Sequence, residues 1–422
     1  MIALESLKEE AEKCTRCGAC QTVCPVFAEL QRETAVARGK ISLIRGLSTG
    51  QIGISQRLSL YHLQCLGCGA CVENCANDVR VDELVLAMRA YAVQQKGLSF
   101  QKKLILRGIL NSVHLLPLLL KAGSLLQGMV FRKVPKESGL HLRFSLPYLD
   151  RRRLIPSIQT PFFLQKHPQL IHLQGRGEKV AVFVGCSINY LFPSVGESTL
   201  RLLNRSGLSV TLPKEQTCCG LPAYGSGDLQ TARSLALRNM EAFREADFNH
   251  LLVPCASCFY FIKHCYPKLF PDDERVRDFT ARVVEPSIFF SPLIHFSDES
   301  PRRSRGKLRL TYHDPCHLRR GMKIYQEPRR LLRSIPETEF VEMEQADRCC
   351  GMGGSFNFIF YDLSRRILQV KLGAIEKASV DAVVTSCMGC MIQLRDGVSQ
   401  RNMKLPIRHL VEVLDRFADG CV

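Results

Sequence analysis

The spacing of the cysteines constrains this chain of 422 residues more than any other feature. Two tight packets of four come first: Cys14, Cys17, Cys20 and Cys24, then Cys65, Cys68, Cys71 and Cys75. Two packets of five follow much later: Cys186, Cys218, Cys219, Cys255 and Cys258, then Cys316, Cys349, Cys350, Cys387 and Cys390. We expect the remaining two, Cys265 and Cys421, to be ordinary thiols. In a reducing compartment, clustered cysteines are metal ligands or redox groups more often than disulfides.

The rest of the sequence predicts such a compartment. The first residues reach the charged stretch Lys8-Glu9-Glu10 without the apolar segment of a signal peptide. No uninterrupted apolar run approaches the roughly 18 residues of a membrane span. We therefore expect a cytoplasmic protein, and the 46% hydrophobic content predicts a chain that folds.

The two packets of five are an internal repeat. Cys316 follows Cys186 by 130 residues, and Cys387 follows Cys255 by 132 residues, so a unit of constant length occurs twice. Apolar, β-branched runs predict strands at 179–184, 210–212 and 251–253 in the first copy and at 308–312, 339–342 and 382–384 in the second. Helical periodicity lies between them, at 198–203, 231–243, 329–333 and 363–376.

This alternation of strands and helices predicts α/β units with mainly parallel strands. The cysteines follow directly after predicted strands, and the carboxyl ends of the strands are where open α/β sheets place ligands. We expect domains at 1–98, 178–305 and 306–422, with a connector at 99–177.

The first packet, Cys14 to Pro25, matches the C-x2-C-x2-C-x3-C-P run that holds cubane [4Fe–4S] clusters, in which the fourth cysteine ligates the neighbouring cluster. The second packet lacks the proline, because Ala76 follows Cys75; this change affects loop rigidity rather than ligation. Two zinc sites are the alternative, although zinc pairs are usually separated by a longer loop. The expected ligand sets are Cys14, Cys17, Cys20 and Cys75 for cluster 1, and Cys65, Cys68, Cys71 and Cys24 for cluster 2.

Forty residues separate the two packets, and helix formers are frequent from Ala35 to Leu47. This predicts a helical domain rather than the compact two-cluster ferredoxin. The region resembles the helical ferredoxin domains of the succinate dehydrogenase and heterodisulfide reductase type.

Each later unit has five thiols, in the form C…C-C-G…C-x-x-C, where one tetrahedral metal could use only four. Gly220 and Gly351 let the backbone pass close to a bound cluster. With His313-Asp314-Pro315-Cys316-His317 in the second copy, these units resemble the cysteine-rich domain of heterodisulfide reductase subunits. The whole arrangement resembles the iron–sulfur subunits of glycolate oxidase, D-lactate dehydrogenase and anaerobic glycerol-3-phosphate dehydrogenase, and the segment Arg38–Ile44 resembles the first of these most.

The resemblance implies an α+β multidomain fold, in which an α-helical ferredoxin domain precedes a duplicated α/β cysteine-rich (CCG) domain. It implies two cubane clusters and one or two further [4Fe–4S] clusters of cubane or non-cubane type in the CCG units, with zinc left open for one unit. It further implies an electron-transfer subunit of a flavin-dependent glycolate or D-lactate dehydrogenase complex. FAD would lie on a partner subunit, and the electrons would pass to a quinone or another carrier.

Two alternatives stay open at this point. One is a heterodisulfide reductase-like subunit that cleaves a disulfide at a CCG unit, and the other is the iron–sulfur subunit of a glycerol-3-phosphate dehydrogenase. For His313, Asp314 and His317 we expect a supporting or turn-forming role rather than a proton relay. The glycine runs 225–227 and 351–354 do not fit a nucleotide-binding loop, so we expect them to serve close packing.

The segment 101–153 carries 11 cations against Glu137 and Asp150, more than half of the net charge of +17. Leucine and isoleucine recur in it at near-helical spacing. A helix packed on its own domains, a subunit-docking helix and a helix lying on the inner face of a membrane all fit this pattern. Nucleic-acid binding is disfavoured, because the cations lie in an apolar segment without interleaved aromatic residues.

Overall fold

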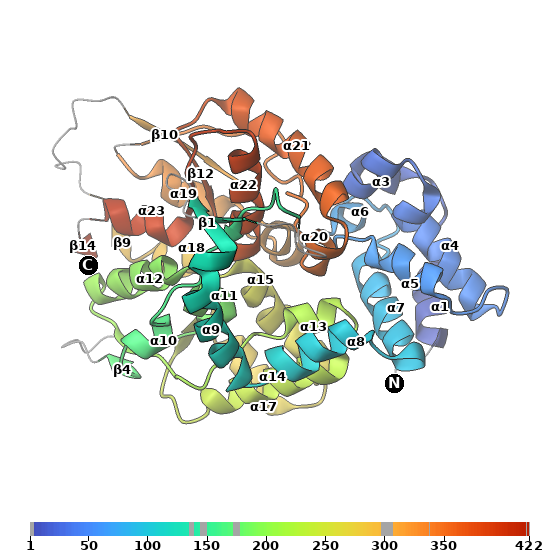
Figure 1. Ribbon diagram of the computed structural model, residues 1–422, viewed down its shortest axis with the longest axis horizontal. Helices are drawn as coiled ribbons and strands as arrows, with labels where there is room; N and C mark the ends of the chain where they lie inside the picture. Colours follow the sequence, from blue (N-terminus) through green and yellow to red (C-terminus); the bar gives the residue numbers. More distant parts are fainter. Residues whose placement is uncertain are drawn as a thin grey trace.

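The structure is a computed structural model that describes residues 4–134, 139–143, 150–171, 178–296, 307–336, 338–418 and 420–421. A helical N-terminal region lies at one end of the molecule, and two α/β units lie beside each other at the other end (Figure 1). The connector between them runs across the α/β units (Figure 1).

The regular structure of the N-terminal region, residues 4–96, is entirely helical. They are α1 (Leu4–Glu12), α2 (Ala19–Val23), α3 (Pro25–Leu30), η1 (Glu33–Ala35), α4 (Ala37–Ser48), α5 (Gln56–Leu63), α6 (Ala70–Glu73) and α7 (Val81–Lys96). Their shared core includes Ile41, Ile44, Leu84 and Met88, which recur at helical spacing on α4 and α7. The long segment between the cysteine packets is therefore helical, as predicted.

The connector has two unlike parts. Its first part is helical, with α8 (Phe100–Lys103), the π-helical η2 (Leu104–Leu110) and α9 (Leu115–Val130). Its second part is a small antiparallel sheet of β1 (Phe131–Val134), β2 (Gly139–Leu142) and β3 (Ile155–Pro156), followed by α10 (Phe163–Lys166) and β4 (Leu170–Ile171). No single described helix is long and apolar enough to cross a membrane. The helices 100–110 and 115–130, which are bent by 99° relative to each other, reach that length and apolar character only when taken together.

The first α/β unit is built on a sheet in the order β4-β6-β5-β7-β8. Its parallel strands are β5 (Lys179–Val182), β6 (Ser209–Thr211), β7 (His250–Leu252) and β8 (Val283–Val284). The helices around them are α11 (Gly185–Tyr190), α12 (Pro193–Arg205), α13 (Leu221–Gly225), α14 (Leu229–Ala242), α15 (Ala256–Tyr260), η3 (Phe261–Cys265), α16 (Tyr266–Leu269), α17 (Glu274–Ala281) and α18 (Pro286–Phe290). The strand β9 (Ile294–His295) follows.

The second unit repeats this topology. Its four parallel strands, in the order β11-β10-β12-β13, are β10 (Leu308–Tyr312), β11 (Thr338–Phe340), β12 (Ala382–Thr385) and β13 (Ile407–His409). Its helices are η4 (His317–Gly321), α19 (Gln326–Arg333), α20 (Ser355–Ile359), α21 (Tyr361–Ala378), α22 (Met388–Gln400) and α23 (Leu410–Phe417), and β14 (Gly420–Cys421) ends the described chain. The equal strand order confirms that the repeat is structural, and every predicted strand and helix of both units is present.

The two units pack with a local symmetry. Helix α12 of the first unit lies on α23 of the second, and the equivalent pair, α19 and α18, packs in the same way. Arg201 donates to the Asp415 carboxylate across the first contact at 2.6 Å. The cores of the two units form one continuous hydrophobic cluster, so they behave as one body rather than as two separately packed domains.

The N-terminal region contacts both units. Arg89, buried on α7, donates to the backbone oxygen of Gly225 at 2.8 Å. On the second unit, Arg320 bridges Glu73 at 2.9 Å and Asp347 at 2.7 Å. Leu66 packs with Cys349 and other residues of the second unit in a small shared core. These contacts hold the second four-cysteine packet, together with Cys24, against the cysteines of the second unit.

Candidate iron–sulfur sites

The first packet lies on a loop that wraps around a small cavity. Gly18 has a φ of +88° and begins α2, so that Cys14, Cys17 and Cys20 turn toward a common point. Cys75, from the end of the second packet, lines the same cavity. Cys17 is exposed to solvent. The fold thus brings together the four thiols expected for cluster 1.

The second packet gathers around Cys24. This residue begins α3, and its Sγ accepts a hydrogen bond from the Phe27 amide at 3.4 Å. Burial raises the pKa of the Cys24 thiol to about 11, and the neighbouring Cys65 and Cys68 contribute to the same rise. Cys71 is close to all three of these thiols. The four residues expected for cluster 2 therefore also lie together.

The segment Arg38-Gly39-Lys40 connects the two packets. Arg38 donates to the Glu33 carboxylate at 2.8 Å and 2.7 Å and reaches the loop of the first packet. Gly39 packs so closely that an added Cβ would lie 1.8 Å from the backbone oxygen of Glu33. Lys40 lies near Cys65 and Cys24, and its Nζ donates to the backbone oxygens of Thr34 and Ala35.

Lys40 belongs to a set of buried cations beside the thiols. Lys40 and Lys371 are each only 1% exposed and Arg89 is 8% exposed, and none of them forms an ion pair with a carboxylate of the described residues. Burial lowers the pKa of Lys40, and it lowers the pKa of Lys371 to about 8. Lys40 and Arg89 lie near Cys65, and Lys371 lies near Cys350. A buried cation is costly unless a negative charge is nearby.

An iron–sulfur cluster held by thiolates supplies that negative charge. The donor set and its electrostatic surroundings therefore fit an anionic cluster at the second packet and in the second unit. Tetrahedral zinc held by four thiolates would also be anionic, so the buried cations indicate a negatively charged metal site of either kind.

In the first CCG unit, all five cysteines lie in segments that follow parallel strands of the sheet. Cys186 lies just after β5, Cys218 and Cys219 precede the turn at Gly220, and Cys255 and Cys258 follow β7. Gly220 has a φ of +102°, a backbone conformation that favours glycine. Cys218, Cys219, Cys255 and Cys258 are buried, whereas Cys186 is half-buried.

The second unit repeats this set and adds a histidine. Cys316 is half-buried, and Cys349, Cys350, Cys387 and Cys390 are buried. His313 is fully buried at the end of β10, and one of its ring nitrogens lies within 4.8 Å of the sulfurs of Cys350 and Cys390. Phe183 holds the equivalent place in the first unit, near Cys258. The two units therefore differ in a group that could join the thiols as a ligand or a hydrogen-bond partner.

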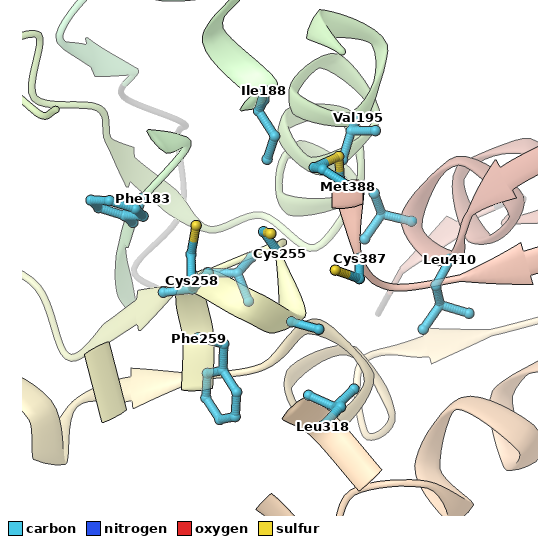
Figure 2. Packing of buried hydrophobic residues seen from close by; sticks show 14 of the residues in the cluster. Phe183, Ile188, Val195, Cys255, Cys258, Phe259, Leu318, Cys387, Met388 and Leu410 are labelled. Atoms are coloured by element: carbon cyan, nitrogen blue, oxygen red, sulfur yellow. The ribbon is translucent and has the colours of Figure 1, made fainter. Parts of the chain in front are cut away.

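The thiol sets adjoin one another. Cys255 of the first unit and Cys387 of the second are neighbours across the boundary of the units, and Figure 2 shows Cys255 between Cys258 and Cys387. At the other side of the second unit, Cys349 is a neighbour of Cys68 from the N-terminal region. The sulfurs thus form an uninterrupted series from the second packet through the second unit into the first.

Several residues of this arrangement were not identified from the sequence. His313 was expected only to support the site, and comparing the two copies would have shown an imidazole opposite Phe183. The sequence did not indicate that Lys40 and Lys371 are buried, because an isolated lysine in a helix is normally exposed. Asp314 forms a buried ion pair with Arg329 at 2.7 Å, and Gly227 packs against the backbone of Arg89, which agrees with the supporting roles expected for them. Cys265 is buried, and the side chain of Cys421 lies outside the described residues.

Cysteine sets at the strand ends of a duplicated α/β unit, next to a helical domain with two further sets, define an iron–sulfur electron-transfer protein. Comparison with known families agrees. A 4Fe-4S dicluster domain matches residues 10–79, and a cysteine-rich domain matches residues 180–263 and 310–395.

Several known proteins are similar to this chain. The probable glycolate oxidase iron-sulfur subunit of Bacillus subtilis is 29% identical over 96% of this chain and 93% of its own length. Lactate utilization protein A of Geobacillus kaustophilus is 32% identical over 56% of this chain and 98% of its own length. A fumarate reductase (CoM/CoB) subunit of Methanothermobacter marburgensis is 33% identical over 57% of this chain, which spans about half (47%) of that relative.

The chain belongs to the family of iron–sulfur subunits that includes the glycolate oxidase iron-sulfur subunit and the lactate utilization proteins A. It binds iron–sulfur clusters and is an electron-transfer subunit of an oxidoreductase complex. The fold alone is shared with a crystal structure of a hypothetical protein from Helicobacter pylori, with a TM-score of 0.53 and 10% identity, over 99% of this chain and 73% of the other.

Proposed function

We propose that this chain relays electrons from a partner subunit that contains FAD and oxidises a 2-hydroxy acid such as glycolate or D-lactate. A flavin accepts two electrons at once, whereas iron–sulfur clusters pass them singly, so the two subunits have complementary roles. The quinone that accepts the electrons, or another carrier, lies at the far end of the relay. The similarity to the glycolate oxidase subunit over nearly the whole chain supports this substrate class.

The observation that carries the proposal is the series of adjoining thiol sets. Cys68 meets Cys349, and Cys387 meets Cys255, so no gap of ordinary protein separates the second packet from either unit. A subunit that only stabilised its partner would not need three adjoining sets of thiols. The exposed loop at Cys17 is the side at which a flavoprotein could approach cluster 1.

This arrangement supports the following ligand sets. Cluster 1 is held by Cys14, Cys17, Cys20 and Cys75, and cluster 2 by Cys65, Cys68, Cys71 and Cys24. Each CCG unit holds a further [4Fe–4S] cluster through its five cysteines, of cubane or non-cubane type. If zinc occupies one unit, the second is the better candidate, because His313 joins Cys350 and Cys390 there. The domains extend over 1–98, 178–305 and 306–422, with 99–177 as the connector.

The connector also supports contact with a membrane surface. Helix α9 has no buried residue, and Leu118, Leu125 and Met129 are 63%, 83% and 71% exposed. No acidic residue occurs from residue 84 to residue 136, a stretch that contains nine cations. An apolar helix in a segment whose only charged residues are cations suits the anionic lipid headgroups of the inner face of the cytoplasmic membrane.

The test is anaerobic copurification of the chain with its flavoprotein, followed by addition of glycolate or D-lactate. Bleaching of the visible absorbance and the appearance of reduced-cluster EPR signals would support the proposal. Iron analysis should give about 16 Fe per chain, at four irons for each of four clusters, whereas about 8 Fe would leave the CCG units without iron. Turnover of a mixed disulfide without any reduction by a hydroxy acid would favour the heterodisulfide reductase alternative.

A further inference from the structure

A cavity of about 550 Å³ lies against the first CCG unit, and two of the five cysteines of that unit reach it. Cys186 and Cys218 form part of its wall, whereas Cys219, Cys255 and Cys258 do not. The cavity therefore lies on the Cys186 and Cys218 side of the thiol set, next to the position of a cluster that the five cysteines would hold. Its size is that of a site for a small organic molecule.

The opposite wall comes from the connector. Leu110, Val113, Leu116 and Pro117, at the bend between η2 and α9, cover the cavity. Helix α9 then continues away from it with its apolar side chains exposed. The apolar residues at this bend continue directly into α9, so a molecule that dissolves in the lipid phase would meet apolar side chains both on the helix and at the cavity.

The floor of the cavity combines an aromatic surface with polar groups. Tyr190 and Phe162 meet edge to face with ring centroids 4.7 Å apart. Exposed His114, Gln165 and Lys214 stand at the rim and can donate hydrogen bonds or protons. Such a wall suits a flat ring that carries carbonyl oxygens, because the ring packs on apolar and aromatic side chains while the oxygens reach the donors.

The local symmetry of the two units gives an independent argument. In the second unit, the face around the half-buried Cys316 is covered by the N-terminal region, where Arg320 pairs with Glu73. Tyr190 is the equivalent of Arg320 at the spacing of 130 residues, and the corresponding face around Cys186 is covered by the connector instead. The face around Cys316 thus adjoins the N-terminal region, whereas the equivalent face around Cys186 borders the cavity.

We propose that this cavity binds the quinone head group that accepts the electrons, with Tyr190 and Phe162 as its floor and Leu116 as its cover. This inference rests on the proposed function and names where its acceptor binds. Reduction of the quinone to the quinol consumes two electrons and two protons. The electrons come from the reduced chain one at a time, and the protons come from solvent at the exposed rim. A protein carrier could not enter such a space, and an anionic hydroxy acid would find few cations in it.

The test uses the full-length chain with its clusters, reduced with a limiting amount of dithionite in the absence of oxygen. The flavoprotein is omitted, so a wrong assignment of the hydroxy acid or of the partner leaves this test intact. Stopped-flow absorbance follows reoxidation by decylubiquinone and, separately, by ferricyanide, which needs no binding pocket. A photoreactive azidoquinone, followed by mass spectrometry of the labelled peptides, reports binding without any turnover.

Leu116→Trp fills the cavity from the connector, and Leu237→Trp, at a 43% exposed position of α14, is the matched control. We expect L116W to slow reoxidation by decylubiquinone about tenfold, equivalent to about 1.4 kcal/mol, with the ferricyanide rate unchanged. Labelling should fall on residues 110–117 and 186–190 in the original chain and in L237W, and should be lost in L116W.

Equal quinone rates and equal labelling in L116W and L237W would overturn the proposal, as would label confined to other peptides. A loss of both the quinone and the ferricyanide rates in L116W, with labelling retained, would also contradict it, because the substitution would then act on the clusters rather than on the cavity. Reoxidation by a small disulfide that L116W abolishes, without any reaction of the quinone, would assign the cavity to a disulfide instead.

Discussion

Ser257 of the first CCG unit places its Oγ 3.2 Å from the Sγ of Cys387 in the second unit. The same hydroxyl lies 3.0 Å from Nδ1 of His317, whose ring stacks on Tyr260 with centroids 4.7 Å apart. The ligands of one unit are therefore positioned in part by the other unit. Neighbouring groups of this kind orient metal ligands and tune the metals they hold.

Ser257→Ala should lower the reduction potential of the cluster in the second unit, because a hydrogen bond to a ligand sulfur stabilises the more negative, reduced state. A loss of about 1 kcal/mol corresponds to roughly 40 mV for a one-electron couple. An EPR-monitored redox titration would measure it. Ser206→Ala, whose hydroxyl bonds only to the Leu202 backbone, is the control and should leave all potentials unchanged.

Lys40→Met should lower the potential of cluster 2. Removing a buried positive charge near Cys24 and Cys65 destabilises the reduced cluster more than the oxidised one, by on the order of 50 mV at a protein-like dielectric. Protein-film voltammetry would detect the shift. Lys8→Met, at an exposed position of α1, should have no effect, and an equal shift in both variants would contradict the assignment of Lys40 to this cluster.

His313→Phe gives the second unit the residue that the first unit already has. If five cysteines hold the iron in both units, the variant should keep its full iron content and change only the EPR spectrum and potential of the second unit. Iron and zinc analysis with EPR would test this. Loss of one equivalent of metal would instead make His313 a ligand, and loss of zinc alone would place zinc in the second unit.

Leu118→Glu combined with Leu125→Glu should weaken binding to lipid vesicles. Both side chains are largely exposed, so the fold should be kept, while two charges enter the apolar face of α9. Cosedimentation with vesicles of phosphatidylglycerol and phosphatidylcholine would measure the loss. Ile288→Glu, at a 42% exposed position on α18, is the control; equal binding of the two variants would show that α9 is not the contact.

The cysteine spacing predicted the main features of this molecule for physical reasons. Metal ligands must meet in space, so the motif around Cys14 and the repeated spacing of Cys186 and Cys316 predicted both the clusters and the duplicated topology. Parallel strands then had to place their following cysteines at one edge of each sheet.

Other features depend on contacts between distant segments and have no local pattern. The approach of Cys68 to Cys349 is set by the docking of the N-terminal region, through Arg89 and Arg320, on two separate surfaces. The burial of Lys371 depends on the loop that its own helix covers, where Nζ donates to the Ala346 oxygen. The amphipathic pattern of the connector fitted a helix packed on its own domains, a subunit-docking helix and a helix on a membrane surface, and the exposure of α9 argues only against the first of these.

The unequal shielding of the thiols has a practical consequence for handling the protein in air. Cys17 stands open to solvent at the surface of the N-terminal region, whereas eight of the ten cysteines in the CCG units are buried. Dioxygen therefore reaches the first packet before the others, and damage should begin there. Aerobic preparations should then lose the outermost redox site early and keep colour from the interior ones, while their ability to take electrons from a partner is already impaired.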